Sequence, residues 1–220
     1  MNLLKIKYID KDFEIEQGKI YSLDIESQNL FIRLANAIID ADNDYLKYSE
    51  DYKCEKFEKK SILITDLFAL DPNSKKILAS LYKRIDSNII SNSDKEEIEK
   101  INTQLLNILN KISLELNTEM QYLLDLDITK ILSLYKFEFS LSNGTLIERL
   151  LSYIKAHMEI MDLKFVITFN ILPLIPDDDF NTFQHEFEVL GLSLININFV
   201  SKFKSKGVEY LTIDKDLCEF

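Results

Sequence analysis

Apolar and polar residues follow patterns that predict strands first and then a helix in the N-terminal part of the chain. Short strands are expected at Leu3–Tyr8, Phe13–Glu16 and Ile20–Leu23. Residues 28–39 place their apolar side chains at helical spacing and predict a helix. Residues 40–60 are polar, have no strong period and are expected to form a solvated connection.

The middle of the chain has a purely helical period. The turn at 71–74 contains a proline, whose fixed φ suits the first turn of a helix. Two apolar stripes cover 74–116, and the polar stretch 91–94 separates them. Ser93 and Glu96 are expected to form a capping box there. This pattern predicts a pair of helices inserted between strands of an α/β core.

Helices and strands alternate again in the C-terminal part. We expect a short helix near Thr129–Leu134, a strand at Lys136–Phe139 and a helix at 145–161 that begins with a capping box of Thr145 and Glu148. The later elements are a strand at Lys164–Phe169, a helix from Asp177 that stops at Gly191, and strands at Leu192–Phe199 and Val208–Ile213. Such alternation indicates a largely parallel, right-handed α/β sheet.

The run Ile62-Leu63-Ile64-Thr65-Asp66 reads as a buried strand that presents an acid at its carboxyl end. In P-loop ATPases such an acid reaches the magnesium ion, and a glycine-rich loop, GxxxxGK[ST], follows an earlier strand. The corresponding turn here, at 24–30, has no glycine and no lysine, and its two acids would repel phosphate. We therefore expect no nucleotide cofactor.

The fold class predicted is α/β, with a P-loop-NTPase-like (RecA-like) head of mostly parallel sheet that lacks a phosphate loop and carries an inserted α-helical leg. The head would comprise residues 1–72 and 128–220, and the leg residues 73–127.

Bulk composition is ordinary for a soluble protein: 220 residues, of which 46% are hydrophobic and 29% charged. No apolar run approaches the roughly 20 residues that span a bilayer, and the N-terminus has no long apolar region typical of a signal peptide. Cys54 and Cys218 lie far apart and have no metal-ligand spacing, which favours plain thiols in the cytoplasm.

The formal net charge of -11 argues at first against nucleic acid, because phosphate contacts need a local positive field. The charge is uneven, however: residues 71–117 carry seven basic and seven acidic groups, and residues 128–164 carry five and four. The candidate DNA-binding residues all lie in this middle region: Lys75, Lys76, Lys83, Arg84, Lys130, Lys136 and Lys155. The alternative is that each lysine only keeps a helix surface solvated.

Acidic residues gather where the helical insertion returns to the core. A stretch without basic residues contains the candidate metal ligands, which are Glu115, Glu119, Asp125 and Asp127. Calcium needs several oxygen ligands, and such a junction could supply them. There is no EF-hand loop, and a solvated acidic face explains the same residues equally well.

The segment Ile62-Leu63-Ile64-Thr65-Asp66-Leu67, followed by Asp71-Pro72-Asn73-Ser74 and a helix, resembles the hhhTDh…DxNS segment of the small Csn-family adaptation protein of type II-A CRISPR systems. Chain length and the order of the N-terminal strands, the helix at 145–161 and the strand Lys164–Phe169 are also similar, so the resemblance covers nearly the whole chain.

The resemblance implies a P-loop-like head with a helical leg and no working nucleotide site. It implies a homotetrameric ring that threads linear double-stranded DNA through a basic hole, with structural calcium bound in the segment Glu115–Asp127. It also implies capture of DNA during spacer acquisition, beside the CRISPR integrase and the effector nuclease. In this sequence the acids of that segment are fewer and differently spaced than in the family.

The function expected is therefore a non-enzymatic, sequence-independent DNA clamp in antiviral defence. Two alternatives stay open. One is a metal-dependent nuclease or degenerate NTPase that uses Asp66 with Asp24 or Glu26. The other is a protein-interaction scaffold with no nucleic-acid partner.

Overall fold

The computed structural model describes residues 2–7, 9, 12–116, 120–121, 126–140, 144–200 and 204–219. The chain divides into two compact units, Met1–Leu70 with Ser142–Phe220 (unit 1) and Asp71–Leu141 (unit 2). Unit 2 continues past residue 127, where the sequence placed the end of the helical leg. The reason is that helix α4 (Ile128–Leu134) packs against helix α2 (Lys75–Arg84).

A five-stranded parallel sheet forms the centre of unit 1, which confirms the expected RecA-like α/β head. Its strands in chain order are β3 (Ile20–Ile25), β6 (Ser61–Ile64), β7 (Phe165–Phe169), β8 (Ser193–Phe199) and β9 (Val208–Ile213). Their order in the sheet is β6-β7-β8-β3-β9, so the first strand lies between the last two. β3 is buried along its whole length, as expected for a parallel strand covered on both faces.

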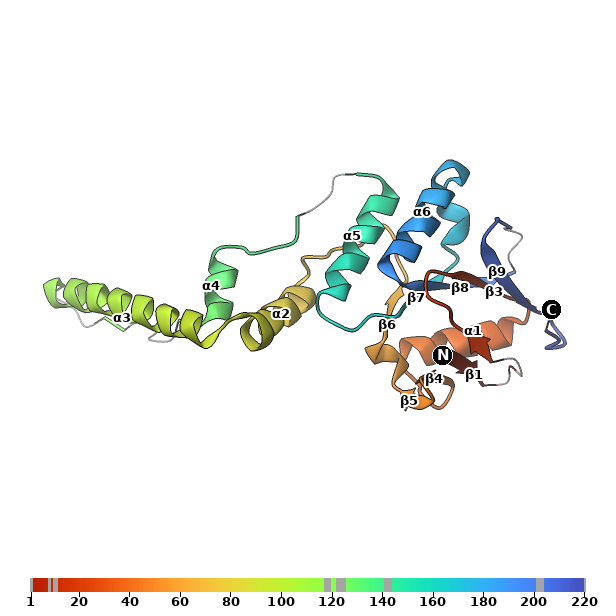
Figure 1. The fold of residues 1–220 in the computed structure, drawn as a ribbon, viewed down its shortest axis with the longest axis horizontal. Helices are drawn as coiled ribbons and strands as arrows, with labels where there is room; N and C mark the ends of the chain where they lie inside the picture. The colour runs from red at the N-terminus through yellow and green to blue at the C-terminus, as the bar shows by residue number, and fades with distance from the viewer. Residues whose placement is uncertain are drawn as a thin grey trace. The chain divides into compact units, whose positions relative to one another are not determined.

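Helices cover both faces of this sheet (Figure 1). Helices α5 (Leu146–Met158) and α6 (Asp177–Leu190), with the short turn η3 (Leu172–Leu174), pack on one face. Phe183 and Phe187 of α6 are fully buried there. Thr145 caps α5 in the expected capping box with Glu148, and Gly191 ends α6 at a φ of 64°.

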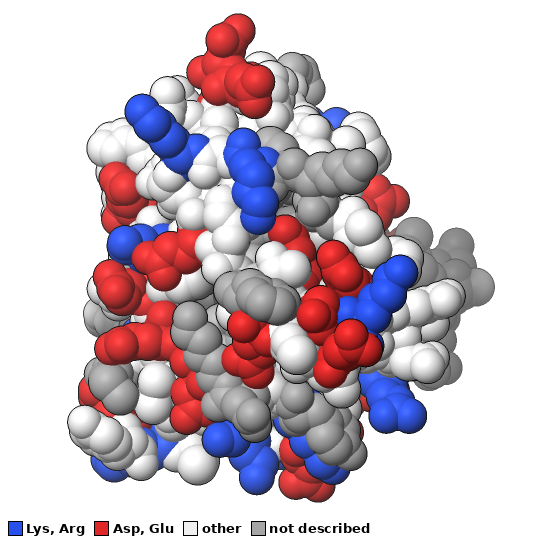
Figure 2. Space-filling view, turned by 90° about the vertical axis from the view of Figure 1, so that its right-hand side faces the viewer, with Lys and Arg blue, Asp and Glu red and all other residues white. Residues whose placement is uncertain are grey.

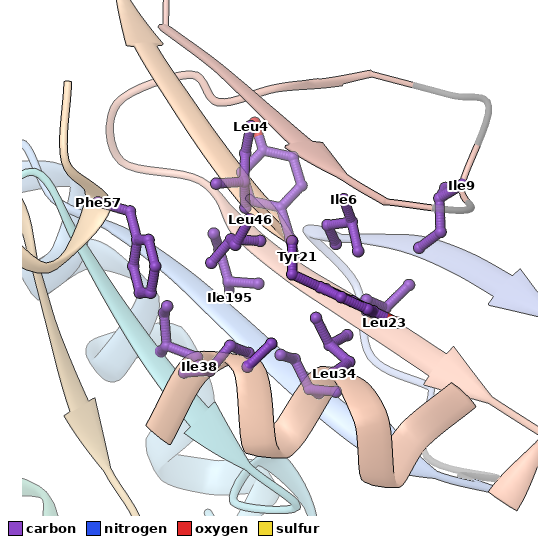
Figure 3. Close-up of a cluster of buried hydrophobic side chains, with 14 of the residues drawn as sticks. Leu4, Ile6, Ile9, Tyr21, Leu23, Leu34, Ile38, Leu46, Phe57 and Ile195 are labelled. Atoms are coloured by element: carbon purple, nitrogen blue, oxygen red, sulfur yellow. The ribbon is translucent and has the colours of Figure 1, made fainter. Parts of the chain in front are cut away.

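The opposite face is covered by α1 (Gln28–Ile39) and by a second, antiparallel sheet. Figure 3 shows the cluster in which Leu34 and Ile38 of α1 lie near side chains of both sheets. The second sheet has the order β2-β1-β4-β5, with β1 at Asn2–Ile6, β2 at Phe13–Glu14, β4 at Leu46–Glu50 and β5 at Lys53–Glu55. The predicted strand Leu3–Tyr8 thus corresponds to β1, and Tyr8 lies outside the described residues.

The prediction that residues 40–60 form a solvated connection was wrong, because this segment contains β4, β5 and the turn η1 (Phe57–Lys59). β4 alternates buried Leu46 and Tyr48 with an exposed lysine, which is a strand pattern only five residues long. The hairpin between β4 and β5 turns through two residues of positive φ, Asp51 and Tyr52. Neither residue gives the Asn-Gly or Asp-Gly signal that normally reveals such a turn.

Unit 2 contains α2, the π-helical turn η2 (Ile85–Ile89), α3 (Asn92–Glu115) and α4. The capping box of α3 is formed by Ser91 and Asp94, two residues earlier than predicted. None of the residues of α3 is buried. No helix in the described residues has both the length and the apolar character to cross a membrane.

The strand predicted at Lys136–Phe139 is absent from the structure. Lys136 has a positive φ of 48°, which ends α4 in a turn. Phe139 is then held by Asn73, whose amide group donates to the Phe139 carbonyl (2.9 Å) and accepts from its backbone N–H (2.8 Å). These bonds to a side chain take the place of strand pairing.

Candidate nucleic-acid interface

Helices α2 and α4 enclose a groove of about 530 Å³ within unit 2. The lining residues of α2 and the following turn η2 lie on one face, because 75, 79, 82, 83 and 86 are spaced by helical turns. The described residues that line it are Lys75, Leu78, Ala79, Tyr82, Lys83, Asp86, Thr129, Lys130, Ser133 and Glu138. Three of the seven predicted DNA-binding residues, namely Lys75, Lys83 and Lys130, therefore line one groove.

The charges around this groove differ in how far they are neutralised. In the described part of the chain, neither Lys75 nor Lys83 makes an ion pair, and both are exposed. Lys130 lies 3.6 Å from the carboxylate of Asp127. The carboxylate of Asp86 is 3.1 Å from the ammonium of Lys95, which partly offsets its negative charge in the groove.

Hydroxyl groups also line the same groove. The Tyr82 hydroxyl donates to the carbonyl of Phe137 at 3.0 Å, and burial, aided by the nearby Glu138, raises the pKa of Tyr82. Thr129 and Ser133 add two hydroxyls from α4. The groove thus combines ammonium and hydroxyl groups, which are the side chains that contact phosphate oxygens in protein–DNA complexes.

The other predicted basic residues are not among those that line this groove. Lys76 is exposed on α2, Arg84 is half-buried at its end, and Lys136 lies in the turn after α4. Lys155 belongs to α5 of unit 1, where its ammonium is 3.3 Å from the carboxylate of Glu186. The groove therefore selects a subset of the predicted residues.

Only part of the predicted calcium site can be located. Glu119 and Asp125 lie outside the described residues, and Glu115 is exposed at the last turn of α3. Among the described residues no three acidic, histidine or cysteine side chains form a metal-binding group.

Asp127 serves as the N-cap of α4. Its Oδ1 accepts hydrogen bonds from the Thr129 hydroxyl (2.6 Å) and the Lys130 backbone N–H (2.9 Å). The Thr129 hydroxyl, followed by the Lys130 amide, lowers the pKa of Asp127. A carboxylate suits calcium, but this one is already engaged in capping, so the described residues do not form a ready-made site.

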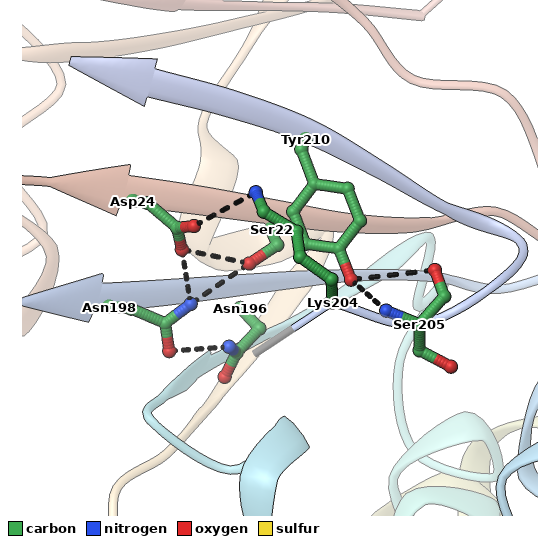
Figure 4. A network of polar contacts seen from close by, with 7 residues as sticks. All are labelled: Ser22, Asp24, Asn196, Asn198, Lys204, Ser205 and Tyr210. Atoms are coloured by element: carbon green, nitrogen blue, oxygen red, sulfur yellow. Dashed lines mark hydrogen bonds and ion pairs between the residues drawn. The ribbon is translucent and has the colours of Figure 1, made fainter. Parts of the chain in front are cut away.

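In unit 1, the carboxyl ends of the strands hold a buried polar network instead of a phosphate loop (Figure 4). The Asn198 amide donates to Oδ1 of Asp24 (2.7 Å) and to the hydroxyl of Ser22 (2.9 Å), and that hydroxyl donates to Asp24 (3.0 Å). The ammonium of Lys204 lies 3.7 Å from the other carboxylate oxygen of Asp24 and 3.9 Å from the ring centre of Tyr210.

The acids proposed for a nuclease or NTPase do not form one cluster. Asp66 is exposed beyond β6, and its carboxylate accepts the backbone N–H of Phe68 in a local turn (2.8 Å). Asp24 and Glu26 belong to the end of β3, which lies three strand positions from β6. At about 4.8 Å per strand this separation is roughly 14 Å.

A comparison with known families identifies the group of proteins to which this chain is related. The model described as "CRISPR-associated protein (Cas_Csn2)" matches residues 39–217. The chain belongs to this family. The family suggested by the residues around Asp66 is thereby confirmed, and with it the association with CRISPR systems.

One solved structure, with a TM-score above 0.5, supports the fold of this Cas_Csn2 chain. The crystal structure of Stu0660 of Streptococcus thermophilus matches with a TM-score of 0.53 and 18% identity, over 97% of this chain and 75% of that one. A nucleotide-free ATP-binding cassette from an ABC transporter matches with a TM-score of 0.47 and 12% identity, over 100% and 91%. No curated protein matches the chain.

Several groove residues were missed by the sequence interpretation. Tyr82, Thr129 and Ser133 are not basic and were not considered, although Tyr82 shares a helix face with Lys75 at i+7. That spacing was available in the sequence. The pairing of α2 with α4, which are separated by α3, was not.

Proposed function

We propose that this Cas_Csn2 chain binds double-stranded DNA without sequence preference and without catalysis, in the cytoplasm, during acquisition of new spacers. The observation that carries the proposal is the groove in which α2 and α4 bring together Lys75, Lys83 and Lys130. Two of these ammonium groups make no ion pair in the described part of the chain. Membership of the family supports the CRISPR context.

The chemistry of the groove fits the phosphate backbone better than the base edges. Lysines are flexible point charges, and they contact phosphates without reading sequence. Arginine, asparagine and glutamine read bases through pairs of hydrogen bonds, and none of them occurs among the described residues that line the groove. Binding should therefore weaken steeply with salt and vary little with sequence.

The location of negative charge favours unit 2 as the DNA-binding part. Unit 1 carries 17 basic and 26 acidic residues, whereas unit 2 carries 9 and 11. On the face that Figure 2 shows, aspartate and glutamate side chains are spread over a large area with lysine and arginine between them. A polyanion is repelled by such a surface, so contacts are favoured where lysines gather.

The assembly is a further part of the proposal. Four copies would form a ring around linear DNA, and they would carry a formal charge of four times -11. Calcium held by Glu115, Glu119, Asp125 and Asp127 would lower the repulsion between these acids. The CRISPR integrase and the effector nuclease are the proposed protein partners. The mass of the native assembly, with and without calcium and DNA, tests this part.

The DNA proposal is tested with two double variants of equal charge. Lys75→Gln with Lys83→Gln removes two groove ammonium groups, and Lys100→Gln with Lys111→Gln removes two exposed ones from α3. Both change the net charge equally, so long-range electrostatics affects them alike. The groove variant should bind a 30-base-pair duplex more weakly and reduce the slope of log K against log salt by about two.

Equal affinities of the two double variants would refute the groove as the binding site. Comparison of linear and closed circular duplex of one sequence then tests threading, because a ring has access only to free ends. Failure of the wild type to bind any duplex at low salt would favour the scaffold alternative.

A further inference from the structure

The antiparallel sheet of unit 1 has a lysine-rich outer face. In β1 and β4 alternate side chains point to opposite faces, and Leu4, Ile6 and Leu46 point into the core (Figure 3). The residues between them, Lys5 and Lys47, and the following Lys7 are all exposed. All three lysines line one hollow of about 190 Å³, together with Asp44 and Tyr45.

The strand register places two of these charges directly opposite each other. Lys5 pairs with Lys47 across the β1–β4 ladder. Like charges in this position destabilise a sheet, so packing and folding do not account for the pair. Protection of a sheet edge does not account for it either, because β1 and β4 are the interior strands and β2 and β5 form the edges.

An acidic neighbour accompanies one of these lysines, Lys5. The ammonium of Lys5 is 3.2 Å from the carboxylate of Asp12, and both groups are about half exposed. Such an exposed pair is weak and is readily exchanged for another anion. Among the described residues, three lysines and one aspartate line the hollow itself. This local excess of positive charge lies in the more acidic of the two units.

We propose that Lys5, Lys7 and Lys47 form a phosphate-binding surface, here called the β1–β4 lysine surface, that contacts a nucleic-acid backbone. It rests on the proposed function for the source of the phosphate, but it is independent of the α2–α4 groove. Alternate residues along a strand are roughly 7 Å apart and opposed residues roughly 5 Å apart. Donors spread over the sheet in this way suit a row of phosphates, as in a nucleic-acid backbone. The alternative source of the phosphate is a small free anion.

The test exploits the unfavourable lysine pair. Lys47→Glu places a negative charge opposite Lys5, so the sheet should become more stable while phosphate binding weakens. The control is Lys215→Glu, which makes the same charge change at an exposed position of unit 1 outside the hollow. We expect Lys47→Glu to weaken duplex binding by about tenfold at low salt relative to the control. The thermal unfolding midpoint of Lys47→Glu should equal or exceed that of the wild type.

A second arm identifies the source of the phosphate by titration with pyrophosphate. Duplex binding that falls only in Lys47→Glu, with no pyrophosphate binding, supports a backbone surface. If wild-type protein binds pyrophosphate and not duplex, and Lys47→Glu loses this binding, the proposed function fails and the phosphate surface stands as a small-anion site. If the wild type binds duplex and the two variants weaken it equally, the β1–β4 lysine surface is refuted and the proposed function survives.

Discussion

Replacing Asn198 by aspartate would place a second carboxylate in the buried network of unit 1. The Asn198 amide nitrogen is 2.7 Å from Oδ1 of Asp24, and the two residues are 1% and 3% exposed. An oxygen in place of that nitrogen would bring two carboxylates into direct contact away from water. Two such groups do not both ionise, so they would share a proton.

The cost of holding this proton can be worked out from the ordinary pKa of aspartate, about 3.9. Each pH unit above that value costs about 1.4 kcal/mol, which gives about 1.5 kcal/mol at pH 5 and about 4 kcal/mol at pH 7. The folded variant binds one more proton than its unfolded state in this range. Its stability therefore falls as the pH rises, by about 1.4 kcal/mol per pH unit or about 2.8 kcal/mol between pH 5 and pH 7.

Urea unfolding at pH 5 and pH 7 measures this difference. Asn198→Ala removes the same amide without adding charge, so its loss of stability should be similar at both pH values. Asn107→Asp adds a carboxylate on the exposed surface of α3 and should leave the free energy of unfolding unchanged at both pH values. If Asn198→Asp is destabilised equally at pH 5 and pH 7, its carboxylate is solvated, and the buried contact between Asp24 and Asn198 is incorrect.

Three further predictions concern unit 1. Phe183→Ala should lower the free energy of unfolding by about 3–5 kcal/mol in urea, because the ring is fully buried, whereas Phe68→Ala, at 69% exposure, should change it little. Lys60→Met removes an ammonium 2.6 Å from Asp162 and 3.2 Å from Glu50; since Asp162 is 61% exposed, we expect a loss of about 1 kcal/mol that shrinks at high salt. Burial raises the pKa of Tyr48 to about 12, so above pH 10 this tyrosine ionises in the unfolded state before it ionises in the folded state. The free energy of unfolding of the wild type should therefore fall above pH 10, and Tyr48→Phe should abolish the part of this fall that Tyr48 causes.

The main elements of the head could be predicted because they carry strong local signals. The strand ending at Asp66, the helix at 28–39 and the capping box of Thr145 are each defined by residues close together in the sequence. Chain reversals without glycine carry no such signal. This explains why the hairpin at Asp51 and Tyr52 was missed.

The candidate interface was predictable only as a list of lysines. The number and helical spacing of these lysines were visible in the sequence. From this pattern Lys75, Lys83 and Lys130 were predicted to bind DNA, together with basic residues that do not line the groove. What the sequence lacked was the contact of α2 with α4, which is set by packing across a gap of more than forty residues. The β1–β4 lysine surface was missed for a similar reason, since the opposition of Lys5 and Lys47 depends on strand register.

The polar network at the carboxyl ends of the strands makes this end of the sheet unfavourable for binding a phosphate. In open α/β sheets this edge is the usual place for a ligand. Here Asp24 accepts bonds from Ser22 and Asn198, and the ammonium of Lys204 lies against its outer oxygen. A phosphate at this position would have to approach a buried carboxylate and displace an ammonium that is already matched to it. Both lysine-bearing surfaces instead lie on elements outside the five-stranded sheet, on α2 and α4 and on β1 and β4, where new charge can be added without disturbing the core.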